Sequence, residues 1–115
     1  MKLWQDLEQE AQLDEIRSAS FQRPQLIFKH SIACGTSAHM QHILRAAENE
    51  MAESMDLHYL DLITFRPVSN LIATSFGVPH QSPQALLIRN GEVIHHSSHF
   101  AIQPNQIIAA ASQPV

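Results

Sequence analysis

Residues 26–37 read LIFKHSIACGTS, an apolar run, a short polar loop and then the only cysteine of the chain, Cys34, with an amphipathic helical pattern directly after it. Unpaired backbone N–H groups and the helix dipole stabilise an anion at a helix start, so we expect a reactive thiolate at Cys34. A lone cysteine cannot close an internal disulfide, and its redox chemistry must therefore pass through an external thiol. The alternative is that Cys34 is a small buried apolar residue, as free cysteines often are.

A second feature lies well downstream of the cysteine. Ser82-Pro83 opens the apolar run of residues 85–88, which ends at the hairpin dipeptide Asn90-Gly91. A proline at the head of such a strand, combined with a thiol at a strand-to-helix junction, favours a cis Ser82–Pro83 bond. A cis bond there would leave the backbone N–H and C=O of Ser82 free to pair with an extended substrate segment. The alternative is an ordinary trans proline in a turn.

The apolar periodicities along the chain predict helices and strands in alternation. Helices are expected at residues 2–18, 35–51, 67–76 and after Pro104, and strands at residues 25–29, 57–63, 84–89 and 92–96. This order, a β-α-β passage followed later by an antiparallel hairpin, is that of thioredoxin. We therefore predict one α/β, thioredoxin-like domain over residues 1–115, with a four-stranded mixed sheet flanked by helices and an extra N-terminal helix.

Composition narrows the classes of function. The 115 residues carry a net charge of −4 with only seven Lys and Arg residues, which offers no basic surface for nucleic acid. No apolar run approaches the roughly 20 residues needed to cross a bilayer, so no membrane partner is expected. The acidic, amphipathic N-terminus is not a secretory signal. A single cysteine without such a signal favours a cytoplasmic location, where thiols stay reduced.

Eight histidines raise the question of a metal site. His39 and His42 are three residues apart on a predicted helix, and three more histidines fall within residues 95–99. Spacings typical of metal ligands, such as Cys-x-x-Cys or His-Glu-x-x-His, do not occur in the sequence. We therefore predict solvated surface histidines and no metal.

The candidate catalytic residues are Cys34, as the nucleophile, and Ser37, which stands where a dithiol enzyme carries its resolving cysteine. The Ser37 hydroxyl can donate a hydrogen bond to the thiolate but cannot form a disulfide. Two histidines are expected in loops bordering Cys34, where either could tune the thiolate or meet a charged substrate. Simple loop exposure is the alternative for both. The residues expected to contact substrate are Gly35, Thr36, Ser82, Pro83, His30 and His80.

Several stretches between about residues 25 and 102 resemble a known family. They are FKHS at residues 28–31 with Cys34, RPVSN at 66–70 with Ile72-Ala73, GV at 77–78, HQSPQ at 80–84, NG at 90–91 and SH at 98–99. Together they resemble the bacilliredoxin-like YtxJ family, redox proteins of the bacillithiol system with a thioredoxin-like fold. The single nucleophilic cysteine of that family, in a Cys-Pro-x-Ser type motif, maps onto Cys34 and Ser37. Gly35 replaces the proline.

The resemblance implies a monothiol thiol–disulfide oxidoreductase that reduces mixed disulfides between proteins and a low-molecular-weight thiol such as bacillithiol. Its partners would be S-thiolated proteins, the small thiol and a partner reductase. The small thiol would serve as co-substrate, with no cofactor. A second interpretation is a non-catalytic thioredoxin-like adaptor that binds a partner peptide beside Pro83. A reactive Cys34 favours the enzyme, whereas an inert buried thiol favours the adaptor.

Overall fold

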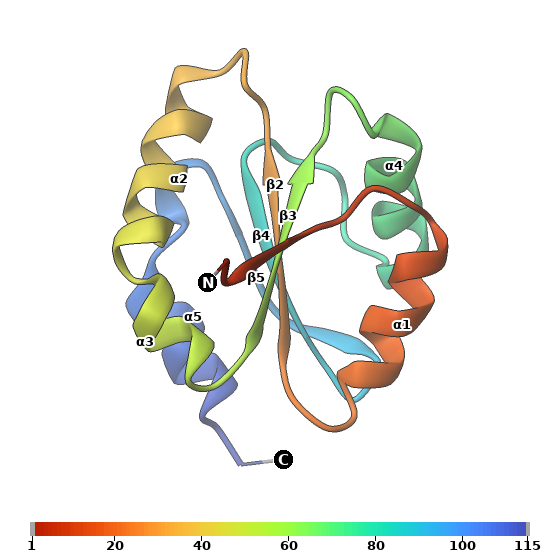
Figure 1. Ribbon diagram of the computed structural model, residues 1–115, viewed down its shortest axis with the longest axis vertical. Coiled ribbons are helices and arrows are strands. Elements are labelled where there is room, and N and C mark those ends of the chain that lie inside the picture. The colour runs from red at the N-terminus through yellow and green to blue at the C-terminus, as the bar shows by residue number, and fades with distance from the viewer. Residues whose placement is uncertain (1, 115) are drawn as a thin grey trace.

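A five-stranded mixed sheet forms the centre of the computed structural model, which describes residues 2–114 (Figure 1). The strand order is β1-β3-β2-β4-β5, with β1 and β2 parallel to β3, β4 antiparallel to β2, and β5 antiparallel to β4. The strands are β1 (Trp4–Asp6), β2 (Gln25–His30), β3 (Asp56–Asp61), β4 (Gln84–Arg89) and β5 (Glu92–Ser98).

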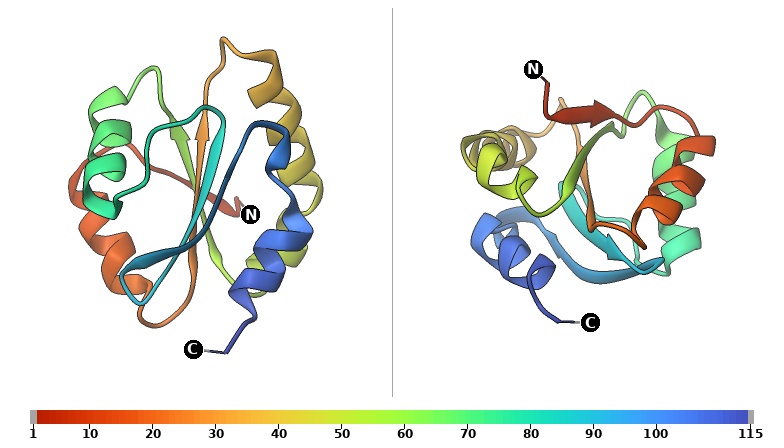
Figure 2. Two further views of the ribbon diagram at one scale, coloured as in Figure 1. Left: turned by 180° about the vertical axis from the view of Figure 1, so that it is seen from behind. Right: turned by 60° about the horizontal axis from the view of Figure 1, so that its bottom comes forward.

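Helices cover both faces of this sheet, as the two views in Figure 2 show. One face carries α1 (Ala11–Ala19) and α4 (Arg66–Phe76), and the other carries α2 (Gly35–Ala46), α3 (Glu48–Ala52) and α5 (Pro104–Ala111), with the short 3-10 turn η1 (His99–Ala101) beside α2. This arrangement confirms the thioredoxin-like α/β class. Within residues 2–114, no helix is long and apolar enough to cross a membrane.

The N-terminal segment corrects the expected strand count from four to five. Its apolar residues suggested one helix over residues 2–18, but only Ala11–Ala19 is helical, and Trp4–Asp6 pairs with β3 as the edge strand β1. Trp4 is buried, and its indole Nε1 donates a hydrogen bond to Glu48 Oε2 at 2.7 Å. The exposed edge of β3 therefore offered backbone partners that the local periodicity could not reveal.

The second predicted helix is divided in two. Residues 35–51 were expected to be continuous, whereas the structure ends α2 at Ala46 and starts α3 at Glu48, with φ −105° and ψ 7° at Ala47. The expected apolar stripe is nevertheless buried at Met40, Leu44 and Met51. The break thus changes the direction of the chain while keeping Met51 in the core.

The turns at Gly77 and Asn90-Gly91 are confirmed. Gly77 ends α4 with φ +68°, and Asn90 and Gly91 have φ +53° and +80° between β4 and β5. Gly91 is buried against α1, and a Cβ atom added there would lie 3.1 Å from Phe21 Cζ. Both the positive φ and the close approach therefore favour glycine at residue 91.

The alternation of β2 sets the two sides of the candidate site. Phe28 belongs to the apolar cluster beneath α2, α3 and α5, and Ile27 to the cluster beneath α1 and α4. Because successive strand side chains point to opposite faces, His30 shares the face of Phe28 and Lys29 that of Ile27. Two adjacent polar residues therefore leave the same strand end in opposite directions.

Candidate active site

Cys34 is the N-cap residue of α2, after the loop that leaves β2. Its backbone is extended, with φ −118° and ψ 120°, and its side chain is half-buried. The Cys34 N–H donates to Ser31 O at 3.2 Å, and Cys34 O accepts from Ala38 N–H at 3.1 Å. The N–H groups of the intervening first turn have no intrahelical partner, so they can stabilise a thiolate at this helix start.

The segment around Pro83 lies at the same end of the sheet as Cys34. The Ser82–Pro83 peptide bond is cis, which confirms that prediction. Lys29 pairs with Gln84 across β2 and β4, so the register places Pro83 opposite His30. In Figure 1 the β2–α2 loop, the β3–α4 loop and the start of β4 all gather at the upper end of the sheet.

The backbone around this proline is only partly engaged. Pro83 O accepts a hydrogen bond from His99 N–H at 3.1 Å. Ser82 lies before β4 begins, and within residues 2–114 no hydrogen bond joins its backbone to another residue. The N–H and C=O of Ser82 can therefore accept an added extended segment.

Ser37 is placed differently from the sequence expectation. It is fully buried, its Oγ accepts from Ser31 N–H at 3.0 Å, and the same Oγ lies 2.7 Å from His30 Nδ1. Within residues 2–114, no hydrogen bond joins Ser37 Oγ to Cys34. The Ser37 hydroxyl is thus held beneath the cysteine loop by two partners that the sequence did not suggest.

His30 is the last residue of β2 rather than a loop residue, and it is buried at 4% exposure. Its ring centroid lies 5.8 Å from that of Phe28 and 5.6 Å from that of Tyr59. Burial lowers the pKa of His30, opposed by its interaction with Ser37 and by the Asp61 carboxylate. A neutral imidazole beside Ser37 therefore prevails at neutral pH.

The tautomer of His30 decides where the Ser37 proton points. If Nδ1 carries the imidazole proton, Ser37 Oγ accepts from both His30 and Ser31, and its own proton is free for another acceptor. If Nε2 carries it, the Ser37 proton is donated to His30 Nδ1 instead. The tautomer of His30 therefore decides whether the Ser37 hydroxyl donates to the imidazole or keeps its proton for another acceptor.

The expected role of His80 beside Cys34 does not match its contacts. His80 is half-buried, and its Nδ1 lies 3.2 Å from Lys29 Nζ and 3.4 Å from Ser69 Oγ, while its Nε2 lies 3.4 Å from Arg66 Nη1. These partners belong to the α1/α4 side of the sheet. Sequence reasoning missed Lys29, although a lysine inside an apolar strand, directly before His30, was a visible signal.

Gly35 and Thr36 form the first turn of α2 beside Cys34. Gly35 is exposed, and a Cβ atom built there meets no other atom within 4 Å. Thr36 is half-buried. The structure thus brings Cys34, Gly35 and Thr36 together with the buried Ser37, whereas His80 lies across the sheet.

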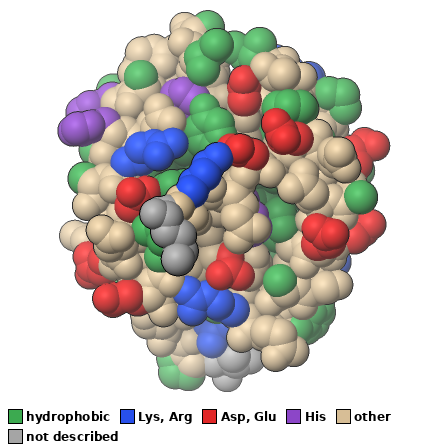
Figure 3. Space-filling model, in the orientation of Figure 1, with side chains coloured by type: hydrophobic (Ala, Val, Ile, Leu, Met, Phe, Trp, Pro, Cys, Tyr) green, Lys and Arg blue, Asp and Glu red, His purple; other side chains and the backbone are tan. Residues whose placement is uncertain are grey.

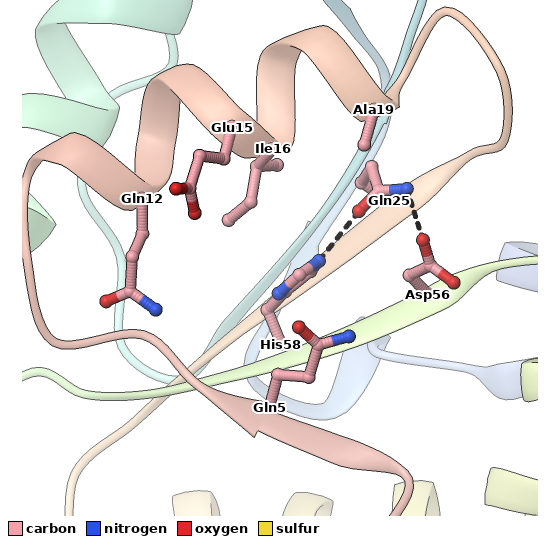
Figure 4. A pocket seen from close by; sticks show the side chains of 8 residues that line it. All are labelled: Gln5, Gln12, Glu15, Ile16, Ala19, Gln25, Asp56 and His58. Carbon is pink, nitrogen blue, oxygen red and sulfur yellow. Dashed lines mark hydrogen bonds between the residues drawn. The ribbon is translucent and has the colours of Figure 1, made fainter.

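A cavity of about 140 Å³ lies at the opposite end of the sheet, where β2 and β3 begin (Figure 4). His58 Nε2 and Gln25 Oε1 are 2.7 Å apart, and Gln25 Nε2 donates to Asp56 Oδ2 at 2.7 Å. Burial lowers the pKa of His58 to about 4, opposed by the Asp56 carboxylate. With no nucleophile in its lining, this polar cluster serves packing rather than thiol chemistry. The lining residues are Gln5, Gln12, Glu15, Ile16, Ala19, Gln25, Asp56 and His58.

The charged side chains and the exposed histidines of the described residues show no concentration that would mark a second site. Acidic and basic side chains are interspersed on the face drawn in Figure 3, in keeping with the net charge of −4. Over residues 2–114, no group of three or more His, Cys, Asp and Glu side chains is arranged to hold a metal ion. His39 and His42 are exposed on α2, as predicted.

The fold and the cysteine at the start of α2 define a thioredoxin-like protein with a single cysteine. The chain is similar to a solved protein described as a candidate oxidoreductase with a thioredoxin fold, at 26% identity and a TM-score of 0.81, covering 96% of this chain and 95% of that one.

Two thioredoxins share the fold at lower identity. A thioredoxin variant from Halobacterium salinarum matches at 14% identity and a TM-score of 0.72, covering 97% of this chain and 93% of that one. A thioredoxin from Malassezia sympodialis matches at 11% identity and a TM-score of 0.73, covering 96% of this chain and 89% of that one.

The monothiol bacilliredoxin BrxC family model matches residues 5–107. The chain therefore belongs to the monothiol bacilliredoxin BrxC family, which supports a role in thiol redox chemistry and confirms the resemblance stated from the sequence.

Proposed function

We propose that this protein is a monothiol oxidoreductase that removes a low-molecular-weight thiol, such as bacillithiol, from mixed disulfides on proteins. The observation that carries the proposal is a half-buried Cys34 at the N-terminus of α2 in a chain with no second cysteine. Membership of the monothiol bacilliredoxin family supports it.

The first step is thiol–disulfide exchange. The Cys34 thiolate attacks the sulfur of the small thiol in the mixed disulfide, forming a new disulfide between Cys34 and that thiol. The protein sulfur leaves as a thiolate and takes a proton from solvent. No electrons enter or leave the system in this step, since one disulfide is exchanged for another.

The second step regenerates the enzyme. A second small-thiol thiolate attacks the small-thiol sulfur on Cys34, so Cys34 leaves as a thiolate and a small-molecule disulfide is released. A partner reductase that attacks the same bond would regenerate Cys34 equally well. The small thiol is thus a co-substrate, no cofactor is needed, and a reducing compartment such as the cytoplasm supplies it.

Two neighbouring groups are suited to assist. The unpaired backbone of Ser82 can pair with the extended segment that carries the modified cysteine, by strand addition. The Ser37 hydroxyl, when His30 Nδ1 donates to it, can turn its proton toward the Cys34 thiolate. These contacts would position the substrate disulfide and stabilise Cys34 as the leaving group of the second step.

The deciding experiment uses three mixed disulfides on one reporter protein, made with bacillithiol, glutathione and cysteine. Wild type should release the small thiol from at least one of them, Ser37→Ala should do so more slowly, and Cys34→Ser should release none. Intact-protein mass spectrometry should find the thiol adduct on Cys34 alone. Release by Cys34→Ser would exclude the mechanism, and failure of wild type on all three would favour the adaptor.

A further inference from the structure

Two cationic donor groups converge on one imidazole, that of His80, at the active-site end of the sheet. Lys29 Nζ lies 3.2 Å from His80 Nδ1, and Arg66 Nη1 lies 3.4 Å from His80 Nε2. Arg66 is the first residue of α4, so the positive end of that helix dipole lies at the same place. The cluster formed by Lys29, Arg66 and His80 is called the cation cluster below.

The cation cluster has no matching acid. Lys29 is fully buried, yet the ion pairs of residues 2–114 are Lys2–Asp6 and Arg23–Asp56, and neither Lys29 nor Arg66 takes part. A buried charge is normally paired, because removing it from water is costly. In a chain of net charge −4, two unmatched cations on one histidine therefore indicate a site for an external anion.

The hydrogen-bond roles leave a vacant acceptor position. An ammonium group can only donate, so His80 Nδ1 must accept from Lys29. The proton of a neutral His80 then resides on Nε2, which faces the guanidinium of Arg66, another group that can only donate. Two donors thus point at the same space, and an oxygen anion beside them would accept from both.

Burial and the loop geometry hold the cation cluster ready for this anion. Burial, with the Arg66 charge adding to it, lowers the pKa of Lys29 to about 8, so the ammonium form still prevails at pH 7. Burial and the charges of Lys29 and Arg66 lower the pKa of His80 and keep its imidazole neutral. The loop that carries His80 is fixed by Gln84, whose Nε2 donates to Pro79 O at 3.1 Å.

We propose that the edge between His80 Nε2 and the Arg66 guanidinium, with the Lys29 ammonium behind it, binds a carboxylate of the small thiol during exchange at Cys34. The identity of the ligand as a thiol rests on the proposed function. The cation cluster and Cys34 lie at the same end of β2 but on opposite faces of the sheet. A ligand that reaches both must cross the sheet end beside Pro83.

The first test is anion binding without any reaction. Succinate, a dicarboxylate with no thiol, is titrated at pH 7 and low salt into wild type, Arg66→Gln and the control Arg89→Gln, and the NMR signals of His80 are followed. Saturable shifts are expected in wild type and in Arg89→Gln. Arg66→Gln should weaken binding about threefold to tenfold, the loss of one partly exposed charged contact. No shift at His80, or equal binding by Arg66→Gln, overturns the site.

The second test separates the acid from its ester during turnover. Reporter proteins carry glutathione or its diethyl ester, which lacks both carboxylates. Arg66→Gln should raise KM for the glutathione mixed disulfide about threefold to tenfold, with little change in kcat. For the ester mixed disulfide, the same substitution should leave KM unchanged. Equal effects on acid and ester overturn the proposal. If neither substrate is turned over, glutathione is not the small thiol of this protein, and the succinate titration decides the anion site on its own.

Discussion

The Ser37 hydroxyl oxygen lies 2.7 Å from Nδ1 of the buried His30 and 3.0 Å from the backbone nitrogen of Ser31. One hydroxyl thus joins the end of β2, the cysteine loop and the first turn of α2 beneath Cys34. Its burial and its two partners indicate that Ser37 holds the cysteine loop in shape. Fold stability and activity should therefore both depend on this oxygen.

We expect Ser37→Ala to destabilise the fold by about 1–3 kcal/mol, because it leaves a buried N–H and a buried imidazole nitrogen without partners. Urea unfolding of wild type and Ser37→Ala measures this loss. Thr36→Ala, one residue away and half-buried, serves as the control and should change stability much less. Equal unfolding midpoints for wild type and Ser37→Ala would show that the contact adds nothing.

Gly35→Pro should stabilise the protein by roughly 0.4–1 kcal/mol, through a less flexible unfolded chain. Three observations favour it: Gly35 is the first residue of α2, where proline is preferred, no atom within 4 Å opposes a Cβ, and Cys34 already has the extended backbone that precedes proline. Thermal unfolding measures the gain, with Gly91→Pro as a control that should destabilise. A lower midpoint for Gly35→Pro would contradict this reading of the helix start.

Removing the Gly35 N–H has a second consequence for Cys34. That group is one of the unpaired donors at the start of α2, so its loss should weaken thiolate stabilisation. We therefore expect Gly35→Pro to react more slowly with iodoacetamide at pH 7 than wild type, by less than tenfold. Gly35→Ala, which keeps the N–H, should react at the wild-type rate.

Most of the fold could be predicted because its signals are local. The stripe at Met40 and Leu44, the hairpin at Asn90-Gly91 and the αL cap at Gly77 each follow from neighbouring residues. Strand β1 was missed because its pairing partner, Leu57 opposite Trp4, is remote in sequence. A short edge strand shares its apolar spacing with the helix that follows, and only the open edge of β3 distinguishes them.

In the candidate site too, the features with local signals could be predicted and those that depend on remote contacts could not. Cys34 at the helix start and cis Pro83 before β4 were predicted from a strand, a helix and a proline in order. The contact of Ser37 with His30, and of His80 with Lys29, depends on which face each side chain of β2 takes. A strand buried on both faces has no polar side to reveal that orientation in its sequence.

His58 should make stability depend on pH on the acid side. Burial holds its pKa at about 4, against 6.5 in the unfolded chain, so between these values the unfolded chain binds a proton that the native state excludes. Protonation of His58 therefore leaves the free energy of unfolding unchanged above pH 6.5 and lowers it as pH falls toward 4. The total decrease is on the order of 3 kcal/mol.

The variant His58→Phe removes this titration together with the hydrogen bond to Gln25. We expect it to be less stable than wild type at pH 7, by about 1 kcal/mol or more, and to approach or exceed wild type near pH 4. Urea unfolding at several pH values measures the difference. The control His39→Phe, on the exposed surface of α2, should show the same pH dependence of unfolding free energy as wild type. A difference in unfolding free energy between His58→Phe and wild type that stayed constant with pH would refute the assignment.

The buried ammonium of Lys29 should lower the stability of the fold while it supports anion binding. Burial, together with the Arg66 charge, lowers its pKa from 10.5 to about 8, so in this window the unfolded chain binds the proton more tightly than the native state. The destabilisation is complete below pH 8 and vanishes as pH rises through 10.5. We therefore expect Lys29→Met, of similar length and without charge, to exceed wild type in stability at pH 7, by up to about 3 kcal/mol.

Lys29→Met should nevertheless bind succinate more weakly than wild type, because the positive charge behind His80 and Arg66 is gone. Urea unfolding from pH 7 to 10.5 should show the stability gain shrinking as wild-type Lys29 loses its proton. Lys2→Met, which removes an exposed lysine paired with Asp6, should show no such pH dependence. If Lys29→Met were less stable at every pH, the ammonium would be a structural group already satisfied in the native protein. A gain in stability accompanied by a loss of anion binding would instead identify Lys29 as a charge retained for its ligand.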